Sequence, residues 1–144
     1  MDTTLDQTER RRSRRLLGIC CSTHVAHDGL SDMLYVLLPV LAEQFGLTLA
    51  QVGLIRGAHR TAMSLFQIPA SLLSERLGER ILLVGGTALA GAAFILAALS
   101  SGFAALMLLL FLAGLGQSVQ HPLCSSILSA AYRDGGRRAA LGTY

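Results

Sequence analysis

The sequence predicts an all-α membrane protein, a polytopic bundle of transmembrane helices. Hydrophobic residues make up 52% of the 144 residues and charged residues only 15%, against about 25% charged in an ordinary soluble domain. The mean hydropathy is +0.53. A bilayer core about 30 Å thick asks for about 20 mainly apolar residues per helix. Four such segments can be placed along the chain.

Short, turn-like connections separate these segments. The expected helices cover about residues 16–41, 50–73, 81–99 and 103–132. Pro69 and Pro122 lie inside expected helices, which a membrane protein tolerates when neighbouring helices satisfy the freed backbone groups. The third segment carries no charge, and its small residues Gly86 and Ala90 allow close packing. We expect this third helix to face lipid and to support the other helices rather than to line a site.

Arginine placement predicts the orientation, because all 12 basic residues are arginine and they avoid two of the connections. Arginines precede the first segment, lie between the second and third, and follow the fourth. The positive-inside rule then makes these parts cytoplasmic. We expect a multi-pass protein of the cytoplasmic (inner) membrane, with a basic tail over residues 1–15 and four helices within 16–132. A cytoplasmic loop over 133–144 would open a fifth helix.

The basic run at residues 10–15 directly precedes a helix, which is typical of a topology anchor that touches anionic lipid. The bilayer is therefore an expected partner and nucleic acid is not. Cys20, Cys21 and Cys124 lack metal-type spacing and are expected to pack in the interior.

Four charged residues lie inside the first two segments, namely Asp28, Asp32, Arg56 and Arg60. A charge in the bilayer costs at least about 2.5–3.5 kcal/mol, so it normally faces a partner or a water-filled path. Because the chain reverses between the segments, Asp32 and Arg60 fall at similar depth. Two interpretations stay open: a static ion pair that fixes helix register, or partners that alternate during proton or anion movement.

Helical spacing groups the candidate site residues. His24, Asp28 and Asp32 are four apart and form one stripe, the candidate proton-coupling residues. Arg60 and Arg56 form a second stripe suited to an anionic substrate group.

The fourth segment adds two more candidate substrate-binding residues, Gln117 and His121, which are also four apart. A metal site is not favoured, because His24 and His27 are three apart with Asp28 next to His27, and no histidine of a second helix has to converge on them. Since no nucleophile–base motif or cofactor fingerprint is present, we expect neither an enzyme nor a cofactor.

The connection at residues 71–80 reads SLLSERLGER. It resembles the loop signature of the major facilitator superfamily between its second and third helices: Gly, three residues, Asp-Arg, one residue, Gly and two basic residues. Glu75 replaces the aspartate, while Ser71 and Glu79 depart from the usual residues. The matching residues are Arg76, Gly78 and Arg80.

Two further regions are similar to the fosmidomycin-resistance-protein branch of that superfamily. They are HVAHDG at 24–29 with LLPVL at 37–41, and GLGQSVQHP at 114–122 with GGRR at 135–138. The second helix of this chain departs from that branch, which leaves the substrate open; the residues that differ are Arg56, His59 and Arg60.

The resemblance implies a carrier of twelve helices in two halves, with alternating access around a central cavity. It implies a proton-driven exporter whose partners are protons and small organic compounds, and an intramembrane arginine suits an anionic one. The gating loop would contain Glu75, Arg76, Gly78 and Arg80. We therefore expect the N-terminal portion of a longer transporter that needs further C-terminal helices. The alternative is a complete four-helix protein, acting as a homo-oligomeric exporter or an assembly partner.

Overall fold

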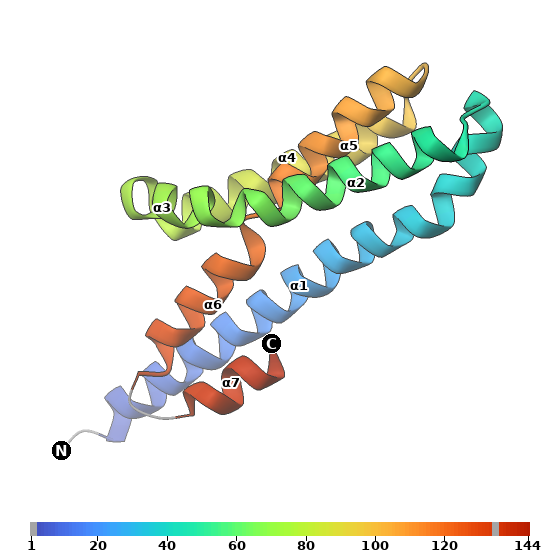
Figure 1. Ribbon diagram of the computed structural model, residues 1–144. Helices are drawn as coiled ribbons and strands as arrows, with labels where there is room; N and C mark the ends of the chain where they lie inside the picture. The colour runs from blue at the N-terminus through green and yellow to red at the C-terminus, as the bar shows by residue number, and fades with distance from the viewer. Residues whose placement is uncertain (1–2, 134–135) are drawn as a thin grey trace.

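The structure is a computed structural model that describes residues 3–133 and 136–144. Within these ranges all regular secondary structure is helical, as the sequence predicts (Figure 1). The helices are α1 (Thr3–Phe45), α2 (Leu49–Leu65), α3 (Gln67–Leu77), α4 (Glu79–Ala98), α5 (Phe103–Gln117), α6 (Gln120–Ala131) and α7 (Arg137–Thr143). Two short parts of the chain lie outside the described residues. They are residues 1–2 of the expected tail and residues 134–135 of the expected last loop, which include Gly135 of the GGRR stretch.

Three stretches of the described chain are long and apolar enough to cross a membrane: Gln7–Phe45, Glu79–Ala98 and Phe103–Ala131. They correspond to the first, third and fourth expected helices. The second is divided at Phe66 into α2, of 17 residues, and α3, of 11 residues. Figure 1 shows α3 continuing in the direction of α2. A further span over residues 49–77 stays a prediction.

A proline lies just beyond each of the two places where the expected helices divide, although Pro39 lies inside the unbroken α1. Proline has no N–H and cannot donate to the carbonyl four residues earlier. Pro69 withholds that bond from Leu65, the last residue of α2. Pro122 withholds it from Ser118, which lies between α5 and α6. After this second break α6 turns away from α5 and runs beside α1 (Figure 1).

The first helix begins at Thr3, well before the expected start near residue 16. No glycine or proline occurs before Gly18, and arginine and glutamate favour helix. The basic run at residues 10–15 therefore lies within α1, and the cytoplasmic position of residues 1–15 stays a prediction.

Small residues let α5 pack closely against α4 on one side and α2 on the other. A Cβ added at Gly116 would lie 2.6 Å from both the nitrogen of Ala90 and the carbonyl oxygen of Gly86. A Cβ at Gly114 would collide with the carbonyl oxygen of His59 on α2. The close packing expected of Gly86 and Ala90 is thus present in the structure.

The buried apolar residues form two clusters. One joins α1, α3, α4, α6 and α7 and includes Cys20, Cys124 and Leu128. The other joins α1, α2, α4 and α5 and includes Leu34 and Leu106. All three cysteines are free, and Cys20 and Cys124 pack in the first cluster.

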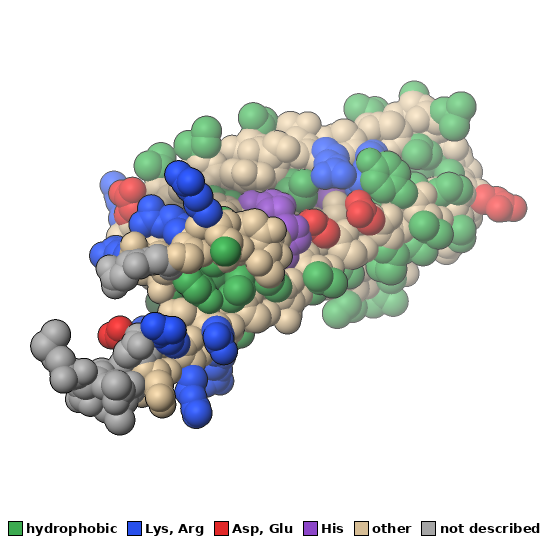
Figure 2. All heavy atoms as spheres, turned by 90° about the horizontal axis from the view of Figure 1, so that it is seen from below, with side chains coloured by type: hydrophobic (Ala, Val, Ile, Leu, Met, Phe, Trp, Pro, Cys, Tyr) green, Lys and Arg blue, Asp and Glu red, His purple; other side chains and the backbone are tan. Residues whose placement is uncertain are grey.

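Large apolar side chains also cover much of the outer surface. Leu49 is 91% exposed, and Val25 and Ile68 are each 73% exposed. Figure 2 shows such side chains along the visible face, while most basic side chains on that face gather at one end. A soluble monomer rarely exposes apolar area on this scale, so lipid is the expected environment of these side chains.

Candidate functional site

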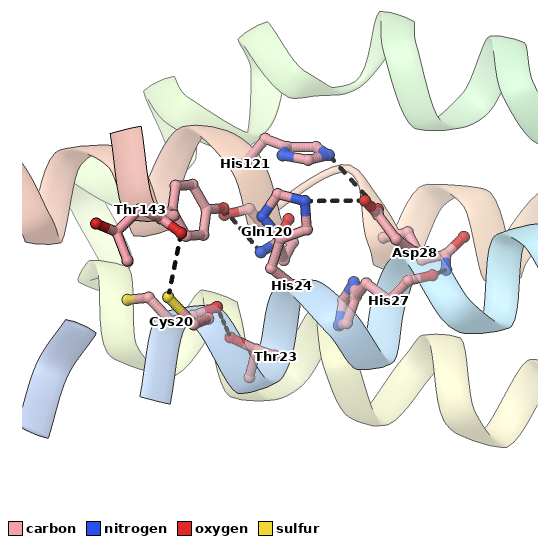
Figure 3. Close-up of polar contacts among 11 residues, drawn as sticks. Cys20, Thr23, His24, His27, Asp28, Gln120, His121 and Thr143 are labelled. Carbon is pink, nitrogen blue, oxygen red and sulfur yellow. Dashed lines mark hydrogen bonds and ion pairs between the residues drawn. The ribbon is translucent and has the colours of Figure 1, made fainter. Parts of the chain in front are cut away.

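The carboxylate of Asp28 lies between two histidines that come from different helices (Figure 3). His24 Nε2 is 2.8 Å from Asp28 Oδ2, one turn back on α1. His121 Nε2 on α6 is 3.9 Å from Asp28 Oδ1. The Asp28 side chain is 49% exposed. We call His24, Asp28 and His121 the histidine–aspartate cluster.

Aromatic contacts fix the orientation of His24. Its ring meets the ring of His121 edge-on with centroids 5.0 Å apart, and that of Tyr144 with centroids 4.8 Å apart. Tyr144 is held in turn by Gln120, whose Nε2 donates to the tyrosine hydroxyl at 2.7 Å. The cluster therefore has a fixed wall made by α6 and the end of α7.

A second polar group is buried except at the half-buried Thr87, and it links four helices. His59 Nε2 on α2 donates to Gln117 Oε1 on α5 at 2.9 Å. The Gln117 amide nitrogen donates to the carbonyl of His27 on α1 at 2.7 Å. The His27 ring bonds through Nε2 to Thr87 Oγ1 on α4 at 3.0 Å, and that hydroxyl donates to the Leu83 carbonyl. We call His27, His59, Thr87 and Gln117 the buried network.

The bonding pattern of the buried network assigns its protons. Because the Gln117 nitrogen donates to a carbonyl, its oxygen must accept, and His59 carries a proton on Nε2. The Thr87 hydroxyl donates to its own helix, so His27 donates to it through Nε2. The Nδ1 atoms of both histidines are buried without a hydrogen-bond partner, which favours neutral rings.

On α1, Arg56 contacts a backbone carbonyl and an aromatic ring rather than a carboxylate. Its Nη1 donates to the Ser31 carbonyl at 3.0 Å, and its guanidinium lies 3.7 Å from the centroid of the Tyr35 ring. Its Nε and Nη2 are buried and have no hydrogen-bond partner in the structure. Arg60 and Asp32 are exposed. Within residues 7–133 and 136–144, no ion pair joins these arginines to Asp28 or Asp32.

The expected gating loop lies where α3 gives way to α4. Gly78 joins the two helices with φ of 87° and ψ of 137°, a conformation that only glycine adopts without strain. The other three residues of the expected loop are exposed; they are Glu75, Arg76 and Arg80.

Sequence reasoning missed three partners in these groups: Thr87, Tyr35 and Tyr144. Thr87 lies on the helix expected only to face lipid, and a lone threonine in an apolar helix usually bonds its own backbone. Tyr35 is three residues beyond Asp32 and so falls beside the same stripe. That spacing is the one signal from which it could have been found.

These features define a class: a polytopic helical membrane protein with titratable side chains inside its apolar helices. Residues 20–144 match the Major Facilitator Superfamily. The chain belongs to that superfamily, as its loop signature predicts.

Two relatives from Escherichia coli (strain K12) are similar to the chain. The fosmidomycin resistance protein is 30% identical over 130 residues, covering 90% of this chain and 32% of that protein. The inner membrane transport protein YajR is 33% identical over 113 residues, covering 75% and 24% respectively. The chain thus spans a third or less of the length of these relatives. The resemblance to fosmidomycin resistance proteins is confirmed, and no solved structure matches the chain.

Proposed function

We propose that this chain belongs to a proton-coupled secondary active transporter that exports small organic compounds by alternating access. Family membership supports a transporter, and the names of the two relatives point to resistance and to inner-membrane transport. The observation that carries proton coupling is the Asp28 carboxylate, half-exposed within an apolar helix and beside His24 at 2.8 Å. An intramembrane carboxylate in such a place is a functional group by default.

The histidine–aspartate cluster can link proton load to helix contact. When Asp28 is ionised, it attracts a protonated His24 on its own helix and a protonated His121 on α6. A proton on Asp28 removes that charge and weakens the contact between α1 and α6. Asp32, exposed one turn further along, is the second candidate proton carrier, with His24 as the exchanging base.

The arginines are the proposed contacts for an anionic group of the substrate. Arg56 Nε and Nη2 are the pair of donors that binds a carboxylate or phosphonate side by side. Both atoms are buried and have no hydrogen-bond partner in this structure, so a substrate would reach them only after α1 and α2 move apart. Arg60, one turn away and exposed, adds charge. Gln117 is a weaker candidate, because both ends of its amide already bond to protein groups. His121 stays a candidate through its exposed side.

The loop around Gly78 is proposed to act in gating, as the superfamily resemblance implies. The side chains of Glu75, Arg76 and Arg80 are exposed. The whole carrier is proposed to need further helices, since its relatives are about three times as long.

Asp28→Asn in the whole carrier tests proton coupling. Purified carrier is placed in vesicles, and proton movement is followed with a pH-sensitive dye as a phosphonate such as fosmidomycin is added. We expect wild type to move protons and Asp28→Asn to lose that movement. Glu43→Gln, an exposed acid at the end of α1, should behave as wild type. Unchanged proton movement in correctly inserted Asp28→Asn would remove Asp28 from the mechanism.

A further inference from the structure

We propose that His24, Asp28 and His121 bind a divalent transition-metal ion of the zinc class. One ligand atom from each residue lies within 4.8 Å of the other two. Two imidazoles and one carboxylate are a donor set that zinc and its neighbours prefer over calcium or magnesium, which favour oxygen alone. This site goes beyond the proposed transport function and does not depend on it.

The spacing of the donor atoms suits such an ion. Zinc holds nitrogen and oxygen ligands at about 2.0–2.2 Å, which puts the ligand atoms of a tetrahedral site about 3.4 Å apart. His24 Nε2 lies 2.8 Å from Asp28 Oδ2, and His121 Nε2 lies 3.9 Å from Asp28 Oδ1. A set with one ligand atom from each residue lies within 4.8 Å, so side-chain rotation is needed to bring one atom of each residue to a single ion.

The backbone supports this geometry from two helices. His24 and Asp28 are four apart on α1, the spacing of zinc ligands carried on a single helix. His121 comes from α6, which packs against α1. No pattern in the sequence predicted that a histidine from a second helix would lie at this site. His27 and His59 turn into the buried network and contribute no ligand.

Charge and access also favour a cation. Asp28 supplies a negative charge, and its ion-pair partners within the described residues are the two histidines rather than an arginine. The side chains of His121 and Asp28 are 38% and 49% exposed. A metal held by three protein ligands therefore keeps a position open for water or another small ligand, as in non-structural zinc sites.

Titration of tag-free carrier in detergent with Zn²⁺, followed by calorimetry and equilibrium dialysis, tests the site. We expect one ion per chain and at least about tenfold weaker binding in His121→Gln, since loss of even an outer-shell partner costs about 10–100-fold. His27→Gln is the matched control: it removes a nearby histidine whose replacement can still donate to Thr87. It should bind Zn²⁺ as wild type does.

A conservative replacement guards against a variant that merely misfolds. His121→Cys offers a thiolate, which zinc also accepts, and should restore binding that His121→Gln loses. No Zn²⁺ bound to wild type, or equal binding in wild type and His121→Gln, overturns the proposal. Because binding is measured without transport, either result leaves the Asp28 test of proton coupling separate.

Discussion

Gln117 joins three helices through one side chain, because both ends of its amide are used. Its oxygen accepts from His59 on α2, and its nitrogen donates to the backbone of α1 at His27. Gln117 is 2% exposed and His59 is fully buried. A buried polar group left without a partner costs about 1–3 kcal/mol, so this amide fixes how α1, α2 and α5 sit together.

Gln117→Ala should therefore lower the free energy of unfolding by about 1–3 kcal/mol, since it leaves a donor and a carbonyl unpaired. Thermal unfolding of the carrier in detergent measures the loss. Gln44→Ala, at an exposed glutamine, should stay within about 0.5 kcal/mol of wild type. Equal effects of the two substitutions would show that the amide bonds contribute little.

Gln117 and His121 also show why a helical spacing is not always a shared face. They are four apart, and in a continuous helix they would point the same way. The helix breaks between them at Ser118 and Val119, so Gln117 bonds to His59 while His121 turns to Asp28. His24 and Asp28 lie on an unbroken helix, and their pairing could be predicted from the sequence. A separation of four residues along one helix could not reveal the partners on other helices.

Among the helices, α5 has the tightest surroundings. Gly116 meets the backbone of α4, and Gly114 meets the backbone of α2. Because backbone atoms cannot move aside as a flexible side chain can, α5 must be free of Cβ atoms at both places. This close approach brings Gln117 within reach of His59.

Gly116→Ala should push α5 away from α4 and lower the unfolding temperature in detergent. An overpacked interior position costs about 1–3 kcal/mol. Gly85→Ala is the matched control on α4, since a Cβ there meets nothing within 4 Å. Alanine favours helix over glycine by about 1 kcal/mol, so this control should be neutral or slightly stabilised. Destabilisation by both substitutions alike would contradict the packing argument.

Three of the four expected spans could be predicted from hydropathy, because they are apolar stretches of membrane length. The ends of the helices could not be predicted in this way. Pro69 and Pro122 were visible, but whether a proline kinks or divides a membrane helix depends on which neighbours satisfy the freed carbonyls. The early start of α1 follows from the absence of glycine and proline before Gly18. A search for apolar stretches does not detect such an absence.

The arginines outside α2 lie toward one end of the molecule. In Figure 1 the start of α1, the junction of α3 with α4, the end of α6 and the start of α7 lie toward the same side. The connections without arginine, at residues 46–48 and 99–102, lie toward the other. This separation accords with the predicted orientation, in which the arginine-rich end faces the cytoplasm.

Reporter fusions test this orientation and the predicted span over residues 49–77 together. Alkaline phosphatase requires disulfides that form outside the cytoplasm. We expect activity when it follows residue 46 or residue 101, and none when it follows residue 78. A fluorescent protein fused at the same positions should give the reverse pattern. Phosphatase activity after residue 78 would mean that residues 49–77 do not cross the membrane.

The wide sequence separation within the buried network has a consequence for how the protein is made. The His27 ring is hydrogen-bonded to Thr87, 60 residues later in the chain, and the His27 carbonyl accepts from Gln117, 90 residues later. During synthesis α1 therefore emerges long before α4 and α5 exist. Hydrocarbon offers no substitute partner for an imidazole, so we expect α1 to stay beside the insertion machinery, or in its aqueous interior, until α4 and α5 have been made.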